Sequence, residues 1–206
     1  MSICVERFIT GPIETNTYLV YNETKECLIV DPSNGLDDVF SFISEASLIP
    51  VAILITHGHF DHIGGIPEMI AAYPQLPVYI HKDEHIMLTD PAHNLSIMLG
   101  EQFSYNGRIE DISEGDLTIG SFTGKTIVIP GHSPAGCAFL FENVLVCGDI
   151  LFPGSIGRTD FPGGDHASLI AGIQKKIMVL DDDVTVCPGH MGRTTIGRER
   201  RMNPFI

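Results

Sequence analysis

An apolar segment that ends in a cluster of metal-ligand side chains occurs early in the chain. Residues 51–55 (VAILI) are followed by THGHFDHIGG, which places three histidines and one aspartate between His57 and His62. A loop that follows a buried strand carries its side chains to a fixed edge of the sheet. His57 and His59 point the same way in an extended segment, so both can reach one ion. Asp61 and His62 follow a turn and can serve a second ion.

Three later strand-like runs end in the same way. TIVIPGH leads to His132, NVLVCGD to Asp149 and DVTVCPGH to His190, and a glycine precedes the polar residue each time. A single histidine after a strand is usually only a polar cap, and a histidine-rich turn is the alternative interpretation of THGHFDHIGG. Four strand ends that each carry His or Asp instead favour one shared metal centre.

The seven side chains divide into two sets of three ligands and one shared carboxylate. The first set is His57, His59 and His132, the second is Asp61, His62 and His190, and Asp149 can bridge the two. Imidazole and carboxylate ligands suit zinc, with iron or manganese as alternatives. Two ions roughly 3.5–4 Å apart lower the pKa of a shared water to around 7, which gives a bridging hydroxide nucleophile. The ligand carboxylates Asp61 and Asp149 are then the candidate catalytic residues.

Length and charge restrict the class of protein. The chain has 206 residues, enough for one domain with a substantial core. A net charge of −14 disfavours nucleic acid as a partner. No apolar run reaches the roughly 18–20 residues of a membrane span, so no membrane partner is expected. No secretory leader is evident, and the five scattered cysteines are typical of buried thiols in a reducing compartment, so we expect a cytoplasmic protein.

The hydrophobic pattern predicts an α/β chain of short strands and few helices. The strands are expected at 3–9, 17–21, 26–30, 51–55, 78–80, 117–119, 125–129, 137–141, 144–147 and 185–187. Helices are expected at 36–46, 66–73, 82–90 and 166–180, the last capped by Asp165. Residues 91–114 are either an irregular loop or a helix that covers the site.

These motifs together resemble the metallo-β-lactamase superfamily. The similarity is greatest to the short, single-domain glyoxalase II-like hydrolases, through NTYLV, IVDPS, IPGHSPAG, GDILFPGSIGRTDFPGGD and VCPGHMGRTTIGRERRMNPF. The resemblance implies one domain over 1–206, folded as a four-layer αββα sandwich with the metal site at the edge between the two sheets. It also implies that Asp31 orients a ligand histidine, although IVDPS could be a plain strand-end turn.

The same resemblance implies a function. We expect two divalent ions, zinc first, whose bridging hydroxide hydrolyses a small-molecule acyl thioester. Arg158 in SIGRTDF could bind a substrate carboxylate, or it could pair with Asp160 or Asp165. Full-length glyoxalase II uses a basic, helical C-terminal extension to bind glutathione, and this chain has only 16 residues after His190, so glutathione specificity is not implied.

Other reactions remain open for the same motifs. A mononuclear iron persulfide dioxygenase would use only His57, His132 and Asp149, and such enzymes also carry a GRTDF-like stretch. A β-lactamase is compatible with the fold, but fold alone does not determine function.

Overall fold

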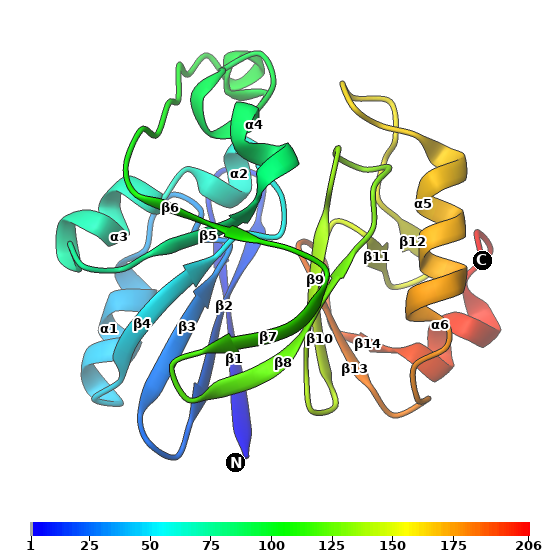
Figure 1. Ribbon diagram of the computed structural model, residues 1–206, viewed down its shortest axis with the longest axis horizontal. Coiled ribbons are helices and arrows are strands. Elements are labelled where there is room, and N and C mark those ends of the chain that lie inside the picture. The colour runs from blue at the N-terminus through cyan, green and yellow to red at the C-terminus, as the bar shows by residue number, and fades with distance from the viewer. Residues whose placement is uncertain (1) are drawn as a thin grey trace.

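The computed structural model describes residues 2–206 and has two six-stranded sheets packed face to face, with helices on the outer surfaces (Figure 1). The first sheet has the order β1 (Ile3–Thr10), β2 (Thr15–Asn22), β3 (Glu26–Val30), β4 (Ile49–Leu54), β5 (Val78–His81) and β6 (Ile109–Ile112). Neighbours from β1 to β3 run antiparallel, and those from β3 to β6 run parallel. The sheet is therefore mixed.

The second sheet is also mixed. Its order is β14 (Thr194–Thr195), β13 (Thr185–Pro188), β10 (Val144–Gly148), β9 (Cys137–Phe141), β8 (Phe122–Val128) and β7 (Gly115–Ile119). Strands β10 and β13 are parallel, and the other neighbours are antiparallel. A separate small hairpin pairs β11 (Leu151–Phe152) with β12 (Ser155–Ile156).

Residues 2–206 also contain six α-helices and three other helical segments, and all of them except the last α-helix lie between strands. The α-helices are α1 (Asp37–Glu45), α2 (Phe60–Ile63), α3 (Ile66–Ala72), α4 (His85–Thr89), α5 (His166–Gly172) and α6 (Ile196–Met202). The other segments are the 3₁₀ segments η1 (Lys82–Glu84) and η2 (Ser96–Leu99) and the π-helical η3 (Ile173–Ile177). As predicted, Asp165 caps α5, because its side chain accepts a hydrogen bond from the Ser168 N–H.

The side chains of β3 point alternately to the two faces of its sheet, and this alternation shows how the four layers form. Cys27 and Ile29 face outward into the cluster that includes residues of α1 and α3, whereas Leu28 and Val30 face inward between the sheets. Successive side chains of a strand point to opposite faces, so a strand that is apolar throughout is covered on both sides. A third cluster packs α5 and η3 against the outer face of the second sheet. This arrangement confirms the predicted αββα sandwich.

The main differences from the predicted elements lie in the less periodic segments. Residues 91–108 contain η2 within irregular backbone, and they lead into β6, a strand that the pattern did not predict because its letters, IEDI, carry two charges. The helix predicted at 82–90 begins with the 3₁₀ segment η1, and the one predicted at 166–180 ends in η3. Within residues 2–206, the structure contains no helix that is both long and apolar enough to cross a membrane.

Candidate metal centre

The topology brings the predicted ligands to one edge between the two sheets. Strands β3 and β4 are parallel, as are β10 and β13, so the chain leaves each pair in the same direction. Strand β8 shares the direction of β10, because both are antiparallel to β9. The segments after β4, β8, β10 and β13 carry the candidate ligands, and α2, which follows β4, lies near the top of Figure 1 at this edge.

All seven predicted ligands lie close together, in three groups that could each hold a metal ion. The groups are His57, His59 and His132; Asp61, His62 and His190; and His57, His62 and Asp149. Within each group the ligand atoms lie within 4.8 Å of one another. The first two groups are the two predicted three-ligand sets.

Asp149 lies between the two sets. Its Oδ2 is 3.5 Å from His132 Nε2 and 3.6 Å from His190 Nε2, and its Oδ1 is 3.5 Å from His62 Nε2. One carboxylate therefore reaches histidines of both sets, which is the geometry expected of a bridging ligand.

Hydrogen bonds on the outer side of three rings turn their inner nitrogens toward the centre of the cluster, where His132 Nε2 lies 3.2 Å from His57 Nε2 and 3.0 Å from His59 Nδ1. His132 Nδ1 donates to the Arg158 carbonyl oxygen at 2.8 Å, and His62 Nδ1 donates to Asp31 Oδ2 at 2.9 Å. Thr56 Oγ1 donates its proton to Asp31 at 2.6 Å, so His57 Nδ1 is the donor in its 3.1 Å contact with that hydroxyl. A neutral imidazole that donates through Nδ1 has its lone pair on Nε2, the form that ligates metals.

Unpartnered atoms in this cluster fit a divalent cation. The buried atoms of this cluster that make no hydrogen bond include His59 Nε2, His62 Nε2 and Asp149 Oδ1, and His62 Nε2 lies 3.1 Å from Asp61 Oδ2. A buried polar atom without a partner costs about 1–3 kcal/mol, so such atoms are rare unless a ligand satisfies them. Nitrogen and carboxylate oxygen donors aimed at one another, without thiolates, are the donor set of zinc, iron or manganese.

The two sets differ electrostatically. Burial lowers the pKa of His57 and His59 well below the usual value, and neighbouring imidazoles act in the same direction. Burial would also lower the pKa of His62, but nearby carboxylates, first that of Asp61, raise it well above the usual value. Burial is again the largest single influence and lowers the pKa of His190, but the hydrogen bond to Asp61 and the charges of Asp149 and Asp61 together raise it above the usual value. The set of Asp61, His62 and His190 therefore retains protons to higher pH than the set of His57, His59 and His132 does.

Asp31 occupies the position that the resemblance implied. Its carboxylate also accepts the Thr56 N–H at 2.7 Å, in addition to the Thr56 hydroxyl and His62. Asp31 itself is buried and adopts a left-handed backbone conformation, with φ of 51°. This side chain orients His62 directly and His57 through Thr56.

Two further residues support the ligands and were not found from the sequence. Glu84, which is fully buried, accepts the Gly58 N–H at 2.9 Å and the Ala135 N–H at 2.6 Å, and burial raises its pKa. It therefore joins the loop after β4 to the loop after β8. Thr15, at the start of β2, donates to Asp61 Oδ2 at 2.8 Å. Neither contact has a local sequence signal, since both partners are distant in the chain.

Steric constraints explain why glycine precedes two of the candidate ligands. Gly148 precedes Asp149 with φ of +48°, and a Cβ there would lie 2.3 Å from Thr56 Oγ1. Gly131 precedes His132 with φ of +130°, and a Cβ there would lie 2.5 Å from the Asp165 carbonyl oxygen. Only glycine adopts such angles without strain, so these positions let the backbone turn tightly into the site.

A pocket of about 470 Å³ opens beside the ligands and contains Arg158 on its edge. Arg158 forms two 2.7 Å hydrogen bonds to the Asp160 carboxylate, from Nε and Nη2, and its guanidinium lies 4.0 Å from the Phe161 ring centroid. Of the alternatives predicted for Arg158, the structure contains the pair with Asp160.

Comparisons with known sequences agree with this geometry. Residues 10–190 match the sequence model of the metallo-beta-lactamase superfamily. The probable metallo-hydrolase YqgX of Bacillus subtilis is 37% identical over 204 residues, which cover 97% of this chain and 96% of YqgX. The hydroxyacylglutathione hydrolase GloC of Haemophilus influenzae is 32% identical over 204 residues, which cover 94% of this chain and 93% of GloC.

Solved structures give the same result for the fold. BLEG-1 B3 metallo-beta-lactamase has a TM-score of 0.92 and 40% identity, covering 98% of this chain and 99% of that one. TTHA1623 in a di-iron-bound form has a TM-score of 0.87 and 33% identity, covering 98% of this chain and 100% of that one. The fold predicted from the sequence is thereby confirmed, and the cluster of His and Asp residues lies in a fold that binds divalent metals.

Proposed function

The chain belongs to the metallo-beta-lactamase superfamily and is a metallo-hydrolase of that group, and we propose that it hydrolyses acyl thioesters at a centre of two divalent ions. The observation that carries this proposal is the position of Asp149, within 3.6 Å of ligand nitrogens from both sets. We propose the same seven side chains as the ligands. Zinc is the proposed metal, with iron or manganese as alternatives, and the di-iron form of TTHA1623 makes iron a serious one.

The reaction adds water to the thioester carbonyl and releases a carboxylic acid and a thiol. Divalent ions held by the two sets would supply Lewis acidity and lower the pKa of water to around 7. The chain's own part is to hold the rings with Nδ1 turned outward and Nε2 turned toward the cluster, an orientation that the Nδ1 hydrogen bonds of His62 and His132 maintain. The carboxylates of Asp61 and Asp149 would balance the charge of the bound cations.

The leaving group explains why no further acid is needed. A thiolate leaves readily, so protonation by a strong general acid is not required in the transition state. The proposal therefore relies only on groups in the cluster. Arg158 lines the pocket beside the Phe161 ring, and we propose that these two side chains contact the substrate together.

The name of GloC, a hydroxyacylglutathione hydrolase, supports thioester hydrolysis for this chain. The persulfide dioxygenase alternative needs only His57, His132 and Asp149, and it is compatible with the presence of Asp61, His62 and His190. The TTIGRERRMNPF ending of the sequence favours the hydrolase over it. The name of BLEG-1 makes β-lactam hydrolysis a second candidate, because a lactam carbonyl can be attacked by the same activated water.

A substrate panel tests the proposal. The metal-loaded protein should hydrolyse S-D-lactoylglutathione or other acyl thioesters, and His57→Ala should lose this activity. Nitrocefin turnover and oxygen consumption with a persulfide are measured alongside. If every thioester stays intact while nitrocefin or the persulfide reacts, the proposed reaction is wrong.

A further inference from the structure

The pocket beside the ligands is lined mainly by apolar side chains from segments far apart in the chain. We call the following residues the apolar wall: Ile13, Leu95, Met98, Leu99, Phe152 and Met191. They come from the β1–β2 connection, from η2 and the residue before it, from β11 and from the loop after His190. Four separate segments thus contribute apolar groups to one concavity.

Much of this wall is exposed. Met98 is 67% exposed, Met191 55%, and Ile13 and Leu99 46% each. Singly exposed apolar residues are ordinary, but several around one concave opening mark a binding site for an apolar group. A volume of about 470 Å³ suits a small organic molecule.

Aromatic rings lie against both ligand sets. The centroid of the Phe161 ring is 5.6 Å from that of His59, and the centroid of the Phe152 ring is 6.3 Å from that of His190. Apolar surface therefore borders the reacting position on both sides. Both substituents of a bound thioester would contact apolar groups.

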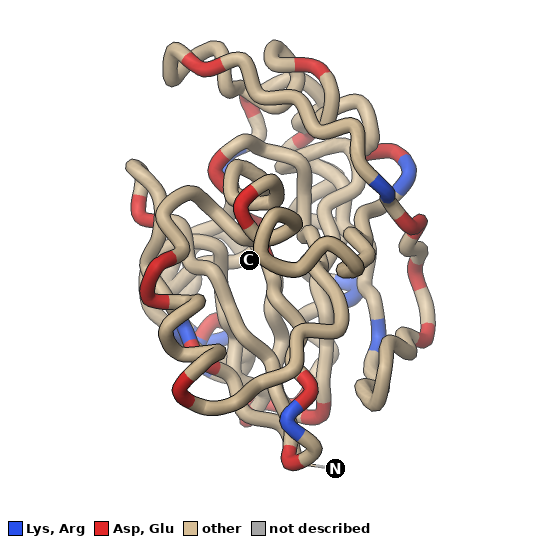
Figure 2. The backbone as a smooth tube through the Cα atoms, turned by 90° about the vertical axis from the view of Figure 1, so that its left-hand side faces the viewer, with Lys and Arg blue, Asp and Glu red and all other residues tan. Residues whose placement is uncertain are grey.

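The pocket offers almost no free positive charge. Among the residues that the structure describes, Arg158 is the only Lys or Arg that lines it, and its guanidinium is already paired with Asp160. The chain as a whole carries −14, and Figure 2 shows acidic positions outnumbering basic ones along the backbone. Glutathione carries carboxylates at both ends and coenzyme A carries phosphates. Such carriers would need cations that this pocket does not supply.

We propose that the substrate of this chain is an uncharged thioester with apolar groups on both sides of the scissile bond, bound against the apolar wall. This inference rests on the proposed thioester hydrolysis and names its substrate class. Each methylene moved from water to such a wall improves binding about fourfold.

Two acetyl thioesters that differ only in the thiol test the substrate class. The thioacetate of benzyl mercaptan should be hydrolysed with a kcat/KM about tenfold or more above that of S-acetylglutathione. Calorimetric titration with benzyl methyl sulfide and S-methylglutathione, which cannot react, measures binding alone. The sulfide should bind more tightly.

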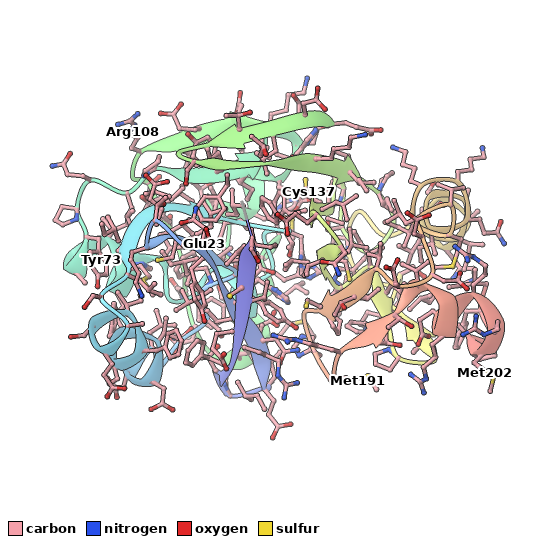
Figure 3. The ribbon with its side chains drawn as sticks, turned by 90° about the horizontal axis from the view of Figure 1, so that it is seen from below. Glu23, Tyr73, Arg108, Cys137, Met191 and Met202 are labelled. Atoms are coloured by element: carbon pink, nitrogen blue, oxygen red, sulfur yellow. The ribbon has the colours of Figure 1, made fainter. Side chains whose placement is uncertain are left out.

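One variant within the apolar wall and two control variants outside it test whether the wall binds the substrate. Met98→Ser should raise KM for the benzyl thioester about fourfold or more, and it should raise KM for S-acetylglutathione by a smaller factor. Met202→Ser is the control, because Met202 is 71% exposed but lies at the outer end of α6, away from Met191 (Figure 3). Ile97→Ser is a second control, since Ile97 is 59% exposed within η2 and does not line the pocket.

The outcomes separate this inference from the function on which it rests. Hydrolysis of S-acetylglutathione in preference to the benzyl thioester would keep the thioesterase and overturn the apolar substrate class. If Met98→Ser and Met202→Ser changed KM for the benzyl thioester equally, the proposed binding role of the apolar wall would be wrong. Hydrolysis of neither thioester would overturn the proposed function.

Discussion

The carboxylate of Asp31 accepts a 2.9 Å hydrogen bond from Nδ1 of His62, and both residues are buried. The contact directs the lone pair of Nε2 into the ligand cluster. The same carboxylate holds Thr56, which contacts His57 Nδ1 at 3.1 Å. Asp31 thus maintains the metal-binding form of one histidine in each set.

Asp31→Asn should weaken metal binding. The amide cannot accept as many hydrogen bonds as the carboxylate, so His62 and Thr56 lose part of their support. Loss of such a partner lowers metal affinity about 10–100-fold, which competition with a chromophoric chelator measures. Asp37→Asn, on the exposed first turn of α1, is the control and should not change the affinity. Equal affinities in the two variants would contradict the role of Asp31.

Glu84→Gln should destabilise the fold near the site. The carboxylate accepts backbone N–H groups of Gly58 and Ala135, and a glutamine oxygen can serve only one of them well. An unsatisfied buried N–H costs about 1–3 kcal/mol, so the free energy of unfolding should fall by that amount in urea titrations. The exposed Glu45→Gln is the control, expected within about 0.5 kcal/mol of wild type. A Glu84→Gln protein as stable as its control would rule out the bridging role.

Gly148→Ala should cost more stability than Gly154→Ala. Both glycines have positive φ, +48° and +68°, so both substitutions strain the backbone by about 1–2 kcal/mol. Only at Gly148 would the new Cβ also meet Thr56 Oγ1, at 2.3 Å, whereas nothing lies within 4 Å at Gly154. Chemical denaturation of the two variants measures the difference. Equal losses would show that the turn into Asp149 is less tightly packed than the structure indicates.

The two ligand sets should respond differently to acid. A raised pKa means that His62 and His190 hold a proton at higher pH, and a protonated imidazole cannot bind a metal. The lowered pKa of His57 and His59 leaves their lone pairs available as the pH falls below about 6.5. The set of Asp61, His62 and His190 should therefore lose its ion first. Metal content after dialysis at steps from pH 8 to pH 5 should fall in two stages in wild type and in one stage in His190→Ala. A single stage in both proteins would contradict the assignment.

The strand-end pattern identified the candidate ligands because it combines two local signals, an apolar run and a glycine before a polar side chain. That pattern does not depend on knowing the topology, and all seven residues lie together in the fold. Asp31 required the family resemblance, since a single aspartate before proline is also typical of a turn.

Other parts of the site depend on tertiary proximity. Glu84 lies in the segment predicted as a helix at 82–90, and the loops at Gly58 and Ala135 approach it in the fold. The apolar wall could not be predicted either, because Ile13, Met98 and Met191 are distant in the chain and have no shared periodicity. Strand β6 was missed because cross-strand pairing with β5, and not its own hydrophobic pattern, makes it a strand.

Counting the metals tests the central claim most directly. Protein purified without chelator, or reloaded with zinc, iron or manganese and then desalted, should contain about two divalent ions per chain by elemental analysis. Asp149→Ala, which removes the side chain between the sets, should retain fewer than wild type. A chain that retains one ion or none under every loading condition would contradict the two-ion centre described above.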